Sequence, residues 1–225
     1  MSQISYQNRD VNPLATLSDF IWVKDKSLSK SFCKDIIKKF DKSEDKYDGL
    51  IGLGFLDKNM KQTKDLGIST APDSDNSLWQ EEDDVLYQAL KEGLDEYHTM
   101  CNGINQGLTV SPQTFNFHDT GYQIQRYEPG GFYDWHHDWT LHNSSSRLWT
   151  YIWYLNTIKK KDEGYTQFID GTKVQPKVGR LVIFPALWNY LHRGFPSKVR
   201  KYICTGWVYG KLSTTLSSGD KFHNT

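Results

Sequence analysis

Cysteine is scarce in this chain, which has three in 225 residues: Cys33, Cys101 and Cys204. Their odd number and wide spacing exclude a disulfide framework and a zinc site built from cysteine pairs. An excess of charge is also missing, because 27 basic residues balance 27 acidic ones. Surfaces that bind nucleic acid or membranes usually carry a basic surplus, so we expect neither partner.

Long apolar runs are absent as well. No stretch approaches the roughly 20 residues that a membrane-spanning helix needs. The N-terminal residues Met1–Ser5 show no basic region followed by an apolar run, which is the mark of a signal peptide. We therefore expect a cytoplasmic chain without a signal peptide or transmembrane segment. The sequence leaves the oligomeric state open.

Aromatic residues, by contrast, are abundant at 14%, which favours β-rich structure. Two stretches before about residue 105 have apolar residues at helical spacing. The first stripe is Leu28, Phe32, Ile36, Ile37 and Phe40, and the second is Val85, Leu86, Leu90, Leu94 and Tyr97, which follows a loop and helix cap expected at 72–77. Short alternating segments separated by turns follow from about residue 110. This order predicts an α+β fold, in which N-terminal helices pack on one sheet of a double-stranded β-helix, or jelly roll. We expect one domain, 1–225, with a helical part to about 105, a catalytic jelly roll over about 106–210 and a polar tail over 211–225.

One short segment contains two metal-ligand residue types at strand spacing. His136 and Asp138 are two residues apart, so on a β-strand they point to the same face. His192, much further along the chain, can supply a third ligand. Two histidines and one carboxylate are the ligand set of the 2-His-1-carboxylate iron(II) site, which leaves positions open for a co-substrate and O₂.

The triplet alone does not decide the matter, because His-x-Asp is a short pattern in a chain with seven histidines. His137 is a neighbouring rival ligand, but it falls on the opposite strand face from His136 and Asp138. The metal interpretation therefore depends on the residues around the triplet.

A lysine nine residues after His192 offers a partner for a co-substrate. Iron(II) bound this way acts with 2-oxoglutarate, which chelates the metal and is decarboxylated, and whose far carboxylate needs a cation. Lys201 opens the apolar strand Tyr202–Trp207, and a buried ammonium needs an anion such as a ligand carboxylate. The alternative is that Arg200 or Lys201 extends to solvent at the strand end.

Two longer motifs surround the triplet. They are Arg126-Tyr127-Glu128-Pro129-Gly130 followed by Tyr133-x-x-His136-x-Asp138, and Gly179-Arg180-Leu181-Val182-Ile183-Phe184-Pro185 ahead of His192. Over about residues 122–207 the chain resembles the 2-oxoglutarate/iron(II) dioxygenases of the prolyl 4-hydroxylase-like group. A match of roughly 90 residues with this spacing is far harder to meet by chance than the triplet alone.

The resemblance implies cofactors and a pocket for them. Iron(II) would bind the triplet, with 2-oxoglutarate and O₂ as co-substrates and ascorbate as a further cofactor. Lys201 matches the basic residue that pairs with the C5 carboxylate of 2-oxoglutarate. Tyr127 matches a tyrosine whose hydroxyl helps to hold that carboxylate, and Thr166 a threonine of the same pocket. Tyr154 is a further candidate for the pocket wall.

The resemblance also implies a substrate side. Tyr133 matches a tyrosine that contacts the target proline, Arg147 a substrate-binding arginine, and Trp207 a tryptophan beside the proline ring. An aromatic wall suits proline, whose apolar ring favours extended peptides. The expected enzyme is a procollagen-proline 4-dioxygenase-like hydroxylase of peptidyl proline, which releases succinate and CO₂.

Two positions depart from the family's pattern. Where the family often has Gly-Gly-Glu-Thr, this chain has Glu163-Gly164-Tyr165-Thr166. Because of the bulky Tyr165, the resemblance does not predict the conformation of the local turn or of the neighbouring substrate loop. The basic residue is lysine rather than the arginine of other branches, and a point charge suffices to hold one carboxylate.

Other functions stay open to different degrees. The same chemistry on a free amino acid or another small molecule is the main alternative, and the loops near 56–76 and 140–147 would decide it by forming a groove or a closed pocket. A nucleic-acid demethylase is disfavoured because Gly206 stands six residues after Arg200, where that branch has a second arginine. Asp138 disfavours halogenation, since no site is vacant for a halide. A non-catalytic jelly-roll binding protein is the remote alternative.

Overall fold

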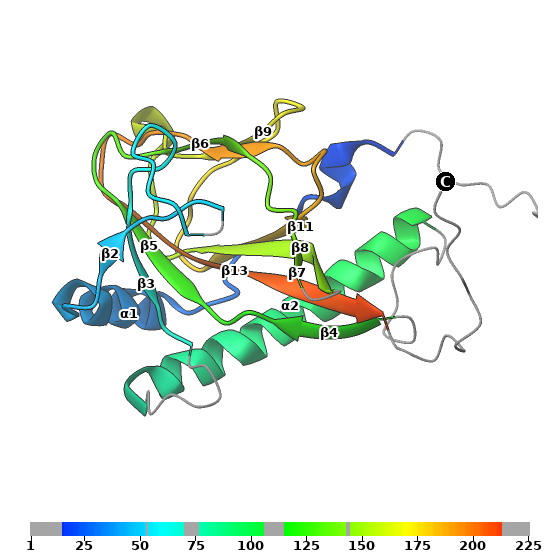
Figure 1. The fold of residues 1–225 in the computed structure, drawn as a ribbon, viewed down its shortest axis with the longest axis horizontal. Helices are drawn as coiled ribbons and strands as arrows, with labels where there is room; N and C mark the ends of the chain where they lie inside the picture. Colours follow the sequence, from blue (N-terminus) through cyan, green and yellow to red (C-terminus); the bar gives the residue numbers. More distant parts are fainter. Residues whose placement is uncertain (1–14, 53, 70–76, 106–114, 143–144, 213–225) are drawn as a thin grey trace, which may run out of the picture.

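The computed structural model describes residues 15–52, 54–69, 77–105, 115–142 and 145–212, and the fold is stated for these residues (Figure 1). Its helices are η1 (Leu17–Phe20), α1 (Lys30–Lys42), η2 (Ser77–Trp79), α2 (Gln80–Asn105) and η3 (Lys160–Asp162). Its strands are β1 (Trp22–Lys24), β2 (Tyr47–Asp48), β3 (Lys64–Gly67), β4 (Phe115–Asp119), β5 (Gln123–Tyr127), β6 (Tyr133–His136), β7 (Leu141–His142), β8 (Ser145–Tyr154), β9 (Thr166–Phe168), β10 (Lys173–Val174), β11 (Arg180–Pro185), β12 (His192–Gly194) and β13 (Lys201–Leu212).

The strands form two sheets that face each other. In the described residues the large sheet follows the order β1-β11-β8-β13-β5-β3-β2, with β4 added to β13 and β7 added to β8. The small sheet follows the order β10-β9-β12-β6. In Figure 1 the small sheet lies above the large one and the two α-helices lie below it. The large sheet is therefore covered on both faces.

Side chains that alternate along the central strands pack in two places, between the large sheet and the helices and between the two sheets. In β8, Tyr151 and Trp153 join the apolar cluster shared with the helices. Ile152 and Tyr154, which alternate with them, join the cluster between the two sheets. Because successive side chains of a strand point to opposite faces, one aromatic-rich strand can build both cores.

Helix α1 packs on the large sheet through one face. It begins after Ser29, whose side chain accepts a hydrogen bond from the Phe32 amide at 3.1 Å and so caps the first turn. Cys33, Ile36 and Phe40 are its buried residues and belong to the cluster that includes the sheet. The expected apolar stripe of this helix is thereby confirmed.

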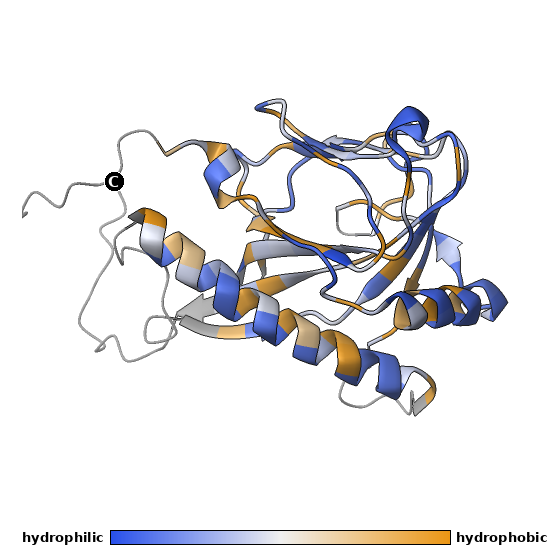
Figure 2. Ribbon diagram, turned by 180° about the vertical axis from the view of Figure 1, so that it is seen from behind, coloured by the Kyte–Doolittle hydropathy of each residue, from blue (hydrophilic) through white to orange (hydrophobic). Residues whose placement is uncertain are grey.

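Helix α2 crosses the same face of the large sheet, as Figure 2 shows from behind. Leu86 and Leu90 are buried against the sheet, but Val85 is 43% exposed, so its expected place in the buried stripe is wrong. Val85 lies about 100° around the helix from Leu86, outside the narrow contact face. At Gly93 a Cβ would lie 2.6 Å from Leu181 Cδ2, so glycine permits this close approach at a cost in helix propensity.

The architecture is mostly β-sheet with two α-helices, which is consistent with the expected jelly roll. Strand β13 continues to Leu212, two residues into the predicted polar tail, and 213–225 lie outside the described residues. The predicted turn and helix cap at 72–76 also lie outside them. Within the described part of the chain, no helix is both long and apolar enough to cross a membrane.

Candidate active site

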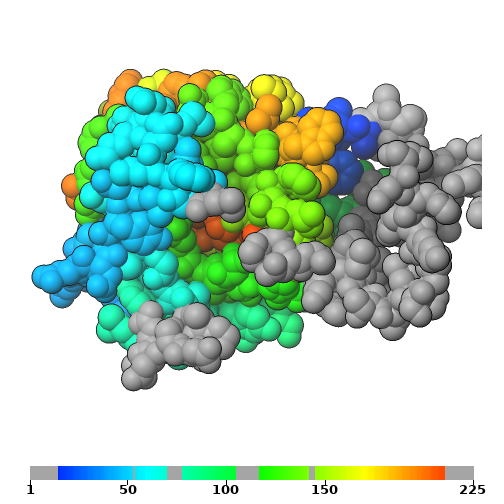
Figure 3. Space-filling view, in the orientation of Figure 1, coloured from blue at the N-terminus to red at the C-terminus, as the bar shows by residue number. Residues whose placement is uncertain are grey.

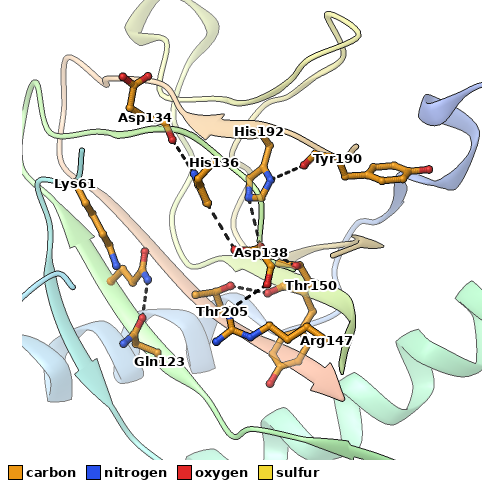
Figure 4. A network of polar contacts seen from close by, with 12 residues as sticks. Lys61, Gln123, Asp134, His136, Asp138, Arg147, Thr150, Tyr190, His192 and Thr205 are labelled. Atoms are coloured by element: carbon orange, nitrogen blue, oxygen red, sulfur yellow. Dashed lines mark hydrogen bonds and ion pairs between the residues drawn. The ribbon is translucent and has the colours of Figure 1, made fainter. Parts of the chain in front are cut away.

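The predicted metal ligands meet between the two sheets. His136 in β6 and His192 in β12 are directly opposite partners in the antiparallel pairing of the small sheet, so both rings point to the same face. Asp138 follows two residues after the end of β6. Its Oδ1 lies 3.8 Å from His136 Nε2 and its Oδ2 lies 3.5 Å from His192 Nε2 (Figure 4).

Both imidazoles are oriented by backbone carbonyls. His136 Nδ1 donates to the Asp134 carbonyl at 2.7 Å, and His192 Nδ1 donates to the Tyr190 carbonyl at 3.0 Å. With Nδ1 protonated, each Nε2 presents a lone pair toward Asp138, which is the usual outer-shell arrangement of metal-binding histidines. Burial, with repulsion from His192 second, lowers the pKa of His136 to about 3. The ring is thus neutral, as a ligand must be.

Asp138 is held by two residues of β8. Thr150 Oγ1 donates to Asp138 Oδ2 at 2.7 Å, and Arg147 Nη1 donates to the Asp138 carbonyl at 3.2 Å. Burial opposes ionisation of this carboxyl, but His192, His136 and Thr150 together keep its pKa below the usual value. Asp138 therefore stays a carboxylate.

These residues fit one metal ion. Two ligand atoms that each lie about 2.1 Å from an ion are separated by roughly 3 to 4 Å, which matches the separations around Asp138. The ligand atoms of all three residues lie within 4.8 Å of one another. Two neutral imidazoles and one carboxylate are the donors of the facial iron(II) triad.

Lys201 is buried at the other end of the same pocket. Its side chain is 2% exposed, and Nζ donates to the Gly164 carbonyl at 3.1 Å and more weakly to the Phe195 carbonyl at 3.5 Å. Among the described residues no carboxylate forms an ion pair with it. Burial lowers its pKa to about 7, so the site stabilises the ammonium only when an anion arrives. The alternative of a lysine extended to solvent is wrong.

One pocket lies between the triad and Lys201, and all four of these residues line it. Tyr127 and Thr166 line it, as predicted. The Tyr127 hydroxyl donates to Gln125 Oε1 at 3.0 Å, and the Tyr127 ring centroid lies 4.1 Å from Lys201 Nζ. Tyr154 does not line the pocket: it lies behind Thr166 and donates to Thr166 Oγ1 at 2.6 Å.

The pocket opens into a wider groove. Tyr133 and Trp207 line both. Tyr133 stacks on His136, with ring centroids 3.5 Å apart and an interplanar angle of 11°. Arg147 places its guanidinium 3.7 Å from the centroid of Trp207 and donates to the Tyr209 hydroxyl at 2.9 Å. Tyr133, Arg147 and Trp207, the three predicted substrate-side residues, therefore lie together at the mouth of the pocket, where it opens into the groove.

Tyr165, which departs from the family's pattern, points away from this pocket. It stacks on Phe195, with centroids 4.6 Å apart and an interplanar angle of 18°. Thr166, the next residue, enters the pocket because strand β9 alternates between its faces. The substitution therefore changes the outer face of the small sheet and leaves the pocket wall in place.

Several pocket residues were missed at the sequence level. Thr150 and Gln125 line the pocket, and Lys61 with Asp65 forms a buried ion pair beside the groove. A signal for Thr150 existed, since strand alternation places its hydroxyl on the face shared by Ile152. For Lys61 no signal was visible: Asp65 is only four residues away, but the strands that bury the pair, β5 and β6, are distant in sequence.

The fold and this site define a class. Residues 122–209 match the family model of the 2OG-Fe(II) oxygenase superfamily. This segment contains the triad and Lys201, and it forms a 2-oxoglutarate-dependent iron(II) dioxygenase domain whose cofactors are Fe(II) and 2-oxoglutarate. The resemblance noted in the sequence is confirmed at this level.

Three solved structures with a similar fold are prolyl hydroxylases. The viral collagen prolyl hydroxylase of Paramecium bursaria Chlorella virus-1 gives a TM-score of 0.58 at 21% identity, over 84% of this chain and 96% of that one. A Trichoplax adhaerens prolyl hydroxylase, in complex with a peptide fragment of the hypoxia inducible factor oxygen degradation domain, gives 0.62 at 17% identity, over 85% and 84%. A Pseudomonas putida prolyl-4-hydroxylase gives 0.57 at 20% identity, over 88% and 95%. Comparison with curated protein sequences gives no match.

Proposed function

We propose that this protein hydroxylates a prolyl residue within a peptide or protein, as a prolyl 4-hydroxylase. When bound at the triad, iron(II) with 2-oxoglutarate and O₂ supplies the oxidising power, and succinate and CO₂ are the other products. His136, Asp138 and His192 are the proposed ligands. We further propose that the chain works as one domain of the double-stranded β-helix type.

The buried ammonium of Lys201 is the observation that carries the cofactor assignment. It lies in the same pocket as the triad, and no carboxylate of the described residues forms an ion pair with it. A dicarboxylate such as 2-oxoglutarate would place one end at the metal and the other at Lys201, supplying the anion that this cation requires. Thr166 and Tyr127, which line the space between, would hold the same carboxylate.

The groove outside the pocket supports a peptide rather than a free amino acid. It extends outward from the cofactor pocket between separate segments of the chain, as a site for an extended peptide does. One wall comes from Leu50, Gly52 and Gly54, and another from Trp139 and Thr140. Both loops named in the sequence analysis contribute, 140–147 through Thr140 and Arg147 and 56–76 through Lys61, while Leu50, Gly52 and Gly54 are an addition that the sequence did not indicate.

The mouth of the pocket supports proline at the reacting position. Tyr133 and Trp207 supply flat apolar faces on two sides, and the Arg147 guanidinium can donate to a backbone carbonyl of an extended peptide. The solved structures of the same fold are prolyl hydroxylases, one of them with a bound peptide, and this likeness also favours a prolyl substrate. Ascorbate as a further cofactor stays a prediction.

The deciding experiment measures succinate released from 2-oxoglutarate with Fe(II) and O₂, using poly(L-proline), a Pro-Pro-Gly repeat peptide and free L-proline in parallel. We expect stimulation by a prolyl peptide, with hydroxyproline formed in equal amount to succinate. Stimulation by free L-proline alone would favour the small-molecule alternative and overturn the peptide assignment.

The metal ligands are tested separately by metal binding. His136→Ala and Asp138→Ala are each expected to lose Fe(II) affinity and turnover while remaining folded. The matched control is His137→Ala, one residue from both and not part of the triad, which should keep Fe(II) affinity. Turnover that survives in either ligand variant would contradict the iron assignment.

A further inference from the structure

The buried ion pair of Lys61 and Asp65 borders the groove, which Lys61 lines. Lys61 Nζ lies 2.6 Å from Asp65 Oδ2, and the two side chains are 3% and 0% exposed. Two buried charges rarely stabilise a fold more than an apolar pair of similar size. Such a pair is therefore better explained by the position that it enforces than by its energy.

The lysine end of this pair contacts the active-site strand. Lys61 forms an antiparallel bridge with Tyr133, and its Nζ lies 5.1 Å from the centroid of the Tyr133 ring. On either side of the bridge, the Gln62 amide donates to the Phe132 carbonyl and the Asp134 amide donates to the Met60 carbonyl, both at 2.8 Å. Segment 60–62 is thus fastened to the start of β6, directly before the metal ligands.

The aspartate end of the pair is fixed by the large sheet. Asp65 lies in β3 opposite Gln125 of β5, and Gln125 lines the cofactor pocket. Burial raises the pKa of the Asp65 carboxyl, although Lys61 opposes this shift. The pair therefore links the large sheet to the small sheet on the open side of the pocket.

The same lysine also supports a hairpin that forms one wall of the groove. Lys61 Nζ lies 3.4 Å from the Leu50 carbonyl, and the Gly49 amide donates to the Thr63 carbonyl at 3.0 Å. Leu50, with Gly52 and Gly54, borders the groove. A Cβ at Gly49 would clash with Thr63 Oγ1 and lie 2.8 Å from Lys61 Cε, so the chain passes here in close contact with the pair.

The space-filling view shows how this wall is placed. In Figure 3 the cyan surface of residues near 50–60 stands on one side and the green surface of residues near 125–145 on the other. Atoms of β13 are visible in red between them. A small shift of the cyan segment would therefore change the width of the groove.

We propose that Lys61 and Asp65 are positioning residues, which fix the groove wall of residues 49–52 and the Tyr133 ring so that the substrate groove is preformed. This inference rests on the proposed function, since the groove is taken to bind the peptide. Neither residue touches the cofactor pocket directly. Their loss should change how the peptide binds and how well 2-oxoglutarate consumption is coupled to hydroxylation.

The first test is independent of turnover. Hydrogen–deuterium exchange is measured on the metal-free protein for the amides of Gln62 and Asp134, in the wild type and in the Lys61→Met/Asp65→Leu double variant. The double variant replaces the charges by an apolar pair of similar size and guards against unfolding. We expect exchange of these amides to rise tenfold or more, while amides of β8 and β13 keep their wild-type rates. Unchanged exchange at Gln62 and Asp134 would overturn the inference.

The second test separates positioning from stability. Lys61→Met and Asp65→Asn are compared with the double variant in thermal unfolding and in peptide kinetics with the Pro-Pro-Gly repeat peptide. We expect each single variant to unfold at a lower temperature and the double variant to recover most of that loss. The KM for the peptide should rise at least fivefold in all three variants, with the KM for 2-oxoglutarate within twofold of wild type.

The outcomes separate this inference from the proposed function. If no prolyl peptide is turned over by the wild type, the proposed function fails while the exchange experiment still decides whether the pair fixes the segment. If the double variant has wild-type peptide KM and wild-type coupling of succinate to hydroxyproline, the pair is structural only and the inference is wrong.

Discussion

The ammonium of Lys201 lies over the ring of Tyr127, with Nζ 4.1 Å from the ring centroid. A ring face supplies modest attraction to a cation, far less than burial costs it. Among the described residues no anion compensates the buried ammonium, so a bound ligand would have to supply one. Binding of 2-oxoglutarate and protonation of Lys201 should therefore be linked.

This linkage predicts a pH-dependent affinity. With its pKa lowered to about 7, free Lys201 loses its proton above pH 7, and a carboxylate then has to restore it. We expect the affinity for 2-oxoglutarate to fall by up to about tenfold per pH unit above pH 7. Calorimetry on Mn(II)-loaded protein in buffers of different ionisation enthalpy should show proton uptake on binding. Lys201→Arg keeps the charge and should lose the pH dependence; an equally steep fall in this variant would contradict the assignment.

The same group predicts how stability changes with pH. Between pH 7 and the ordinary value of 10.5, the unfolded chain keeps a proton on Lys201 that the folded chain has lost. The unfolded state then binds more protons, so the contribution of this residue to the free energy of unfolding rises with pH, by up to about 1.4 kcal/mol per unit. Urea unfolding of the ligand-free protein at pH 7 to 9.5 measures it. The difference in stability between Lys201→Met and wild type should shrink across this range; a constant difference would show that the lysine is not desolvated.

The hydroxyl of Thr150 is expected to tune metal affinity. It donates to Asp138 Oδ2 at 2.7 Å and so fixes the orientation of the only carboxylate ligand. Thr150→Val removes this bond with little change of shape, and loss of an outer-shell partner typically costs 10- to 100-fold in metal affinity. Thr205→Val is the matched control, because the Thr205 hydroxyl, in the same pocket, donates to the Tyr151 carbonyl instead. Fe(II) titration that ranks the two variants equally would contradict this role.

Tyr165 should have no part in the chemistry. On the outer face of the small sheet it stacks on Phe195, and the Lys173 ammonium lies 4.7 Å from its ring centroid. Tyr165→Ala should lose these two contacts, of which the stacking is worth about 0.5 to 1.5 kcal/mol beyond area burial. The KM for 2-oxoglutarate should stay within about twofold of wild type. Thr166→Val, one residue further and inside the pocket, should raise this KM several-fold. A larger effect of Tyr165→Ala than of Thr166→Val would reverse the assignment of the two faces.

The sequence predicted the parts of the site that depend on local spacing. His136 and Asp138 follow from strand alternation, and the family resemblance located His192, Lys201 and the mouth residues. Their convergence is observed because β6 and β12 are neighbours in the small sheet. The α+β layout also follows from local periodicity, since two helices precede the β-rich part.

The remaining features depend on contacts between segments far apart in the chain. Tyr154 was expected in the pocket wall. Several residues of β8 point toward the cavity, but Thr166 lies between Tyr154 and the pocket, and the sequence does not show this contact. Val85 was predicted to be buried but is exposed, because helical periodicity does not predict how wide a face of the helix packs on the sheet. The Lys61–Asp65 pair is recognisable only once the neighbouring strands are assembled.

Arg147 is predicted to control peptide binding without affecting the cofactor. Its guanidinium is stacked 3.7 Å from the Trp207 centroid and donates to the Tyr209 hydroxyl and the Asp138 carbonyl, a geometry that a lysine cannot reproduce. Arg147→Lys should therefore misplace the cation and loosen Trp207, which we expect to raise the KM for the prolyl peptide about 5- to 30-fold, or roughly 1 to 2 kcal/mol.

The matched control for Arg147 uses the same chemistry on the opposite side of the small sheet. Arg193 is held between Trp135 and Phe195, with centroid distances of 4.8 and 4.9 Å, and does not line the pocket or the groove. Arg193→Lys should leave the peptide KM near wild type. In both variants the KM for 2-oxoglutarate should stay unchanged, because the proposed partner of that ligand, Lys201, lies at the far end of the pocket. A parallel rise of both KM values in Arg147→Lys would instead mean that Arg147 acts by holding Asp138, and Fe(II) titration of the variant would then show weakened metal binding.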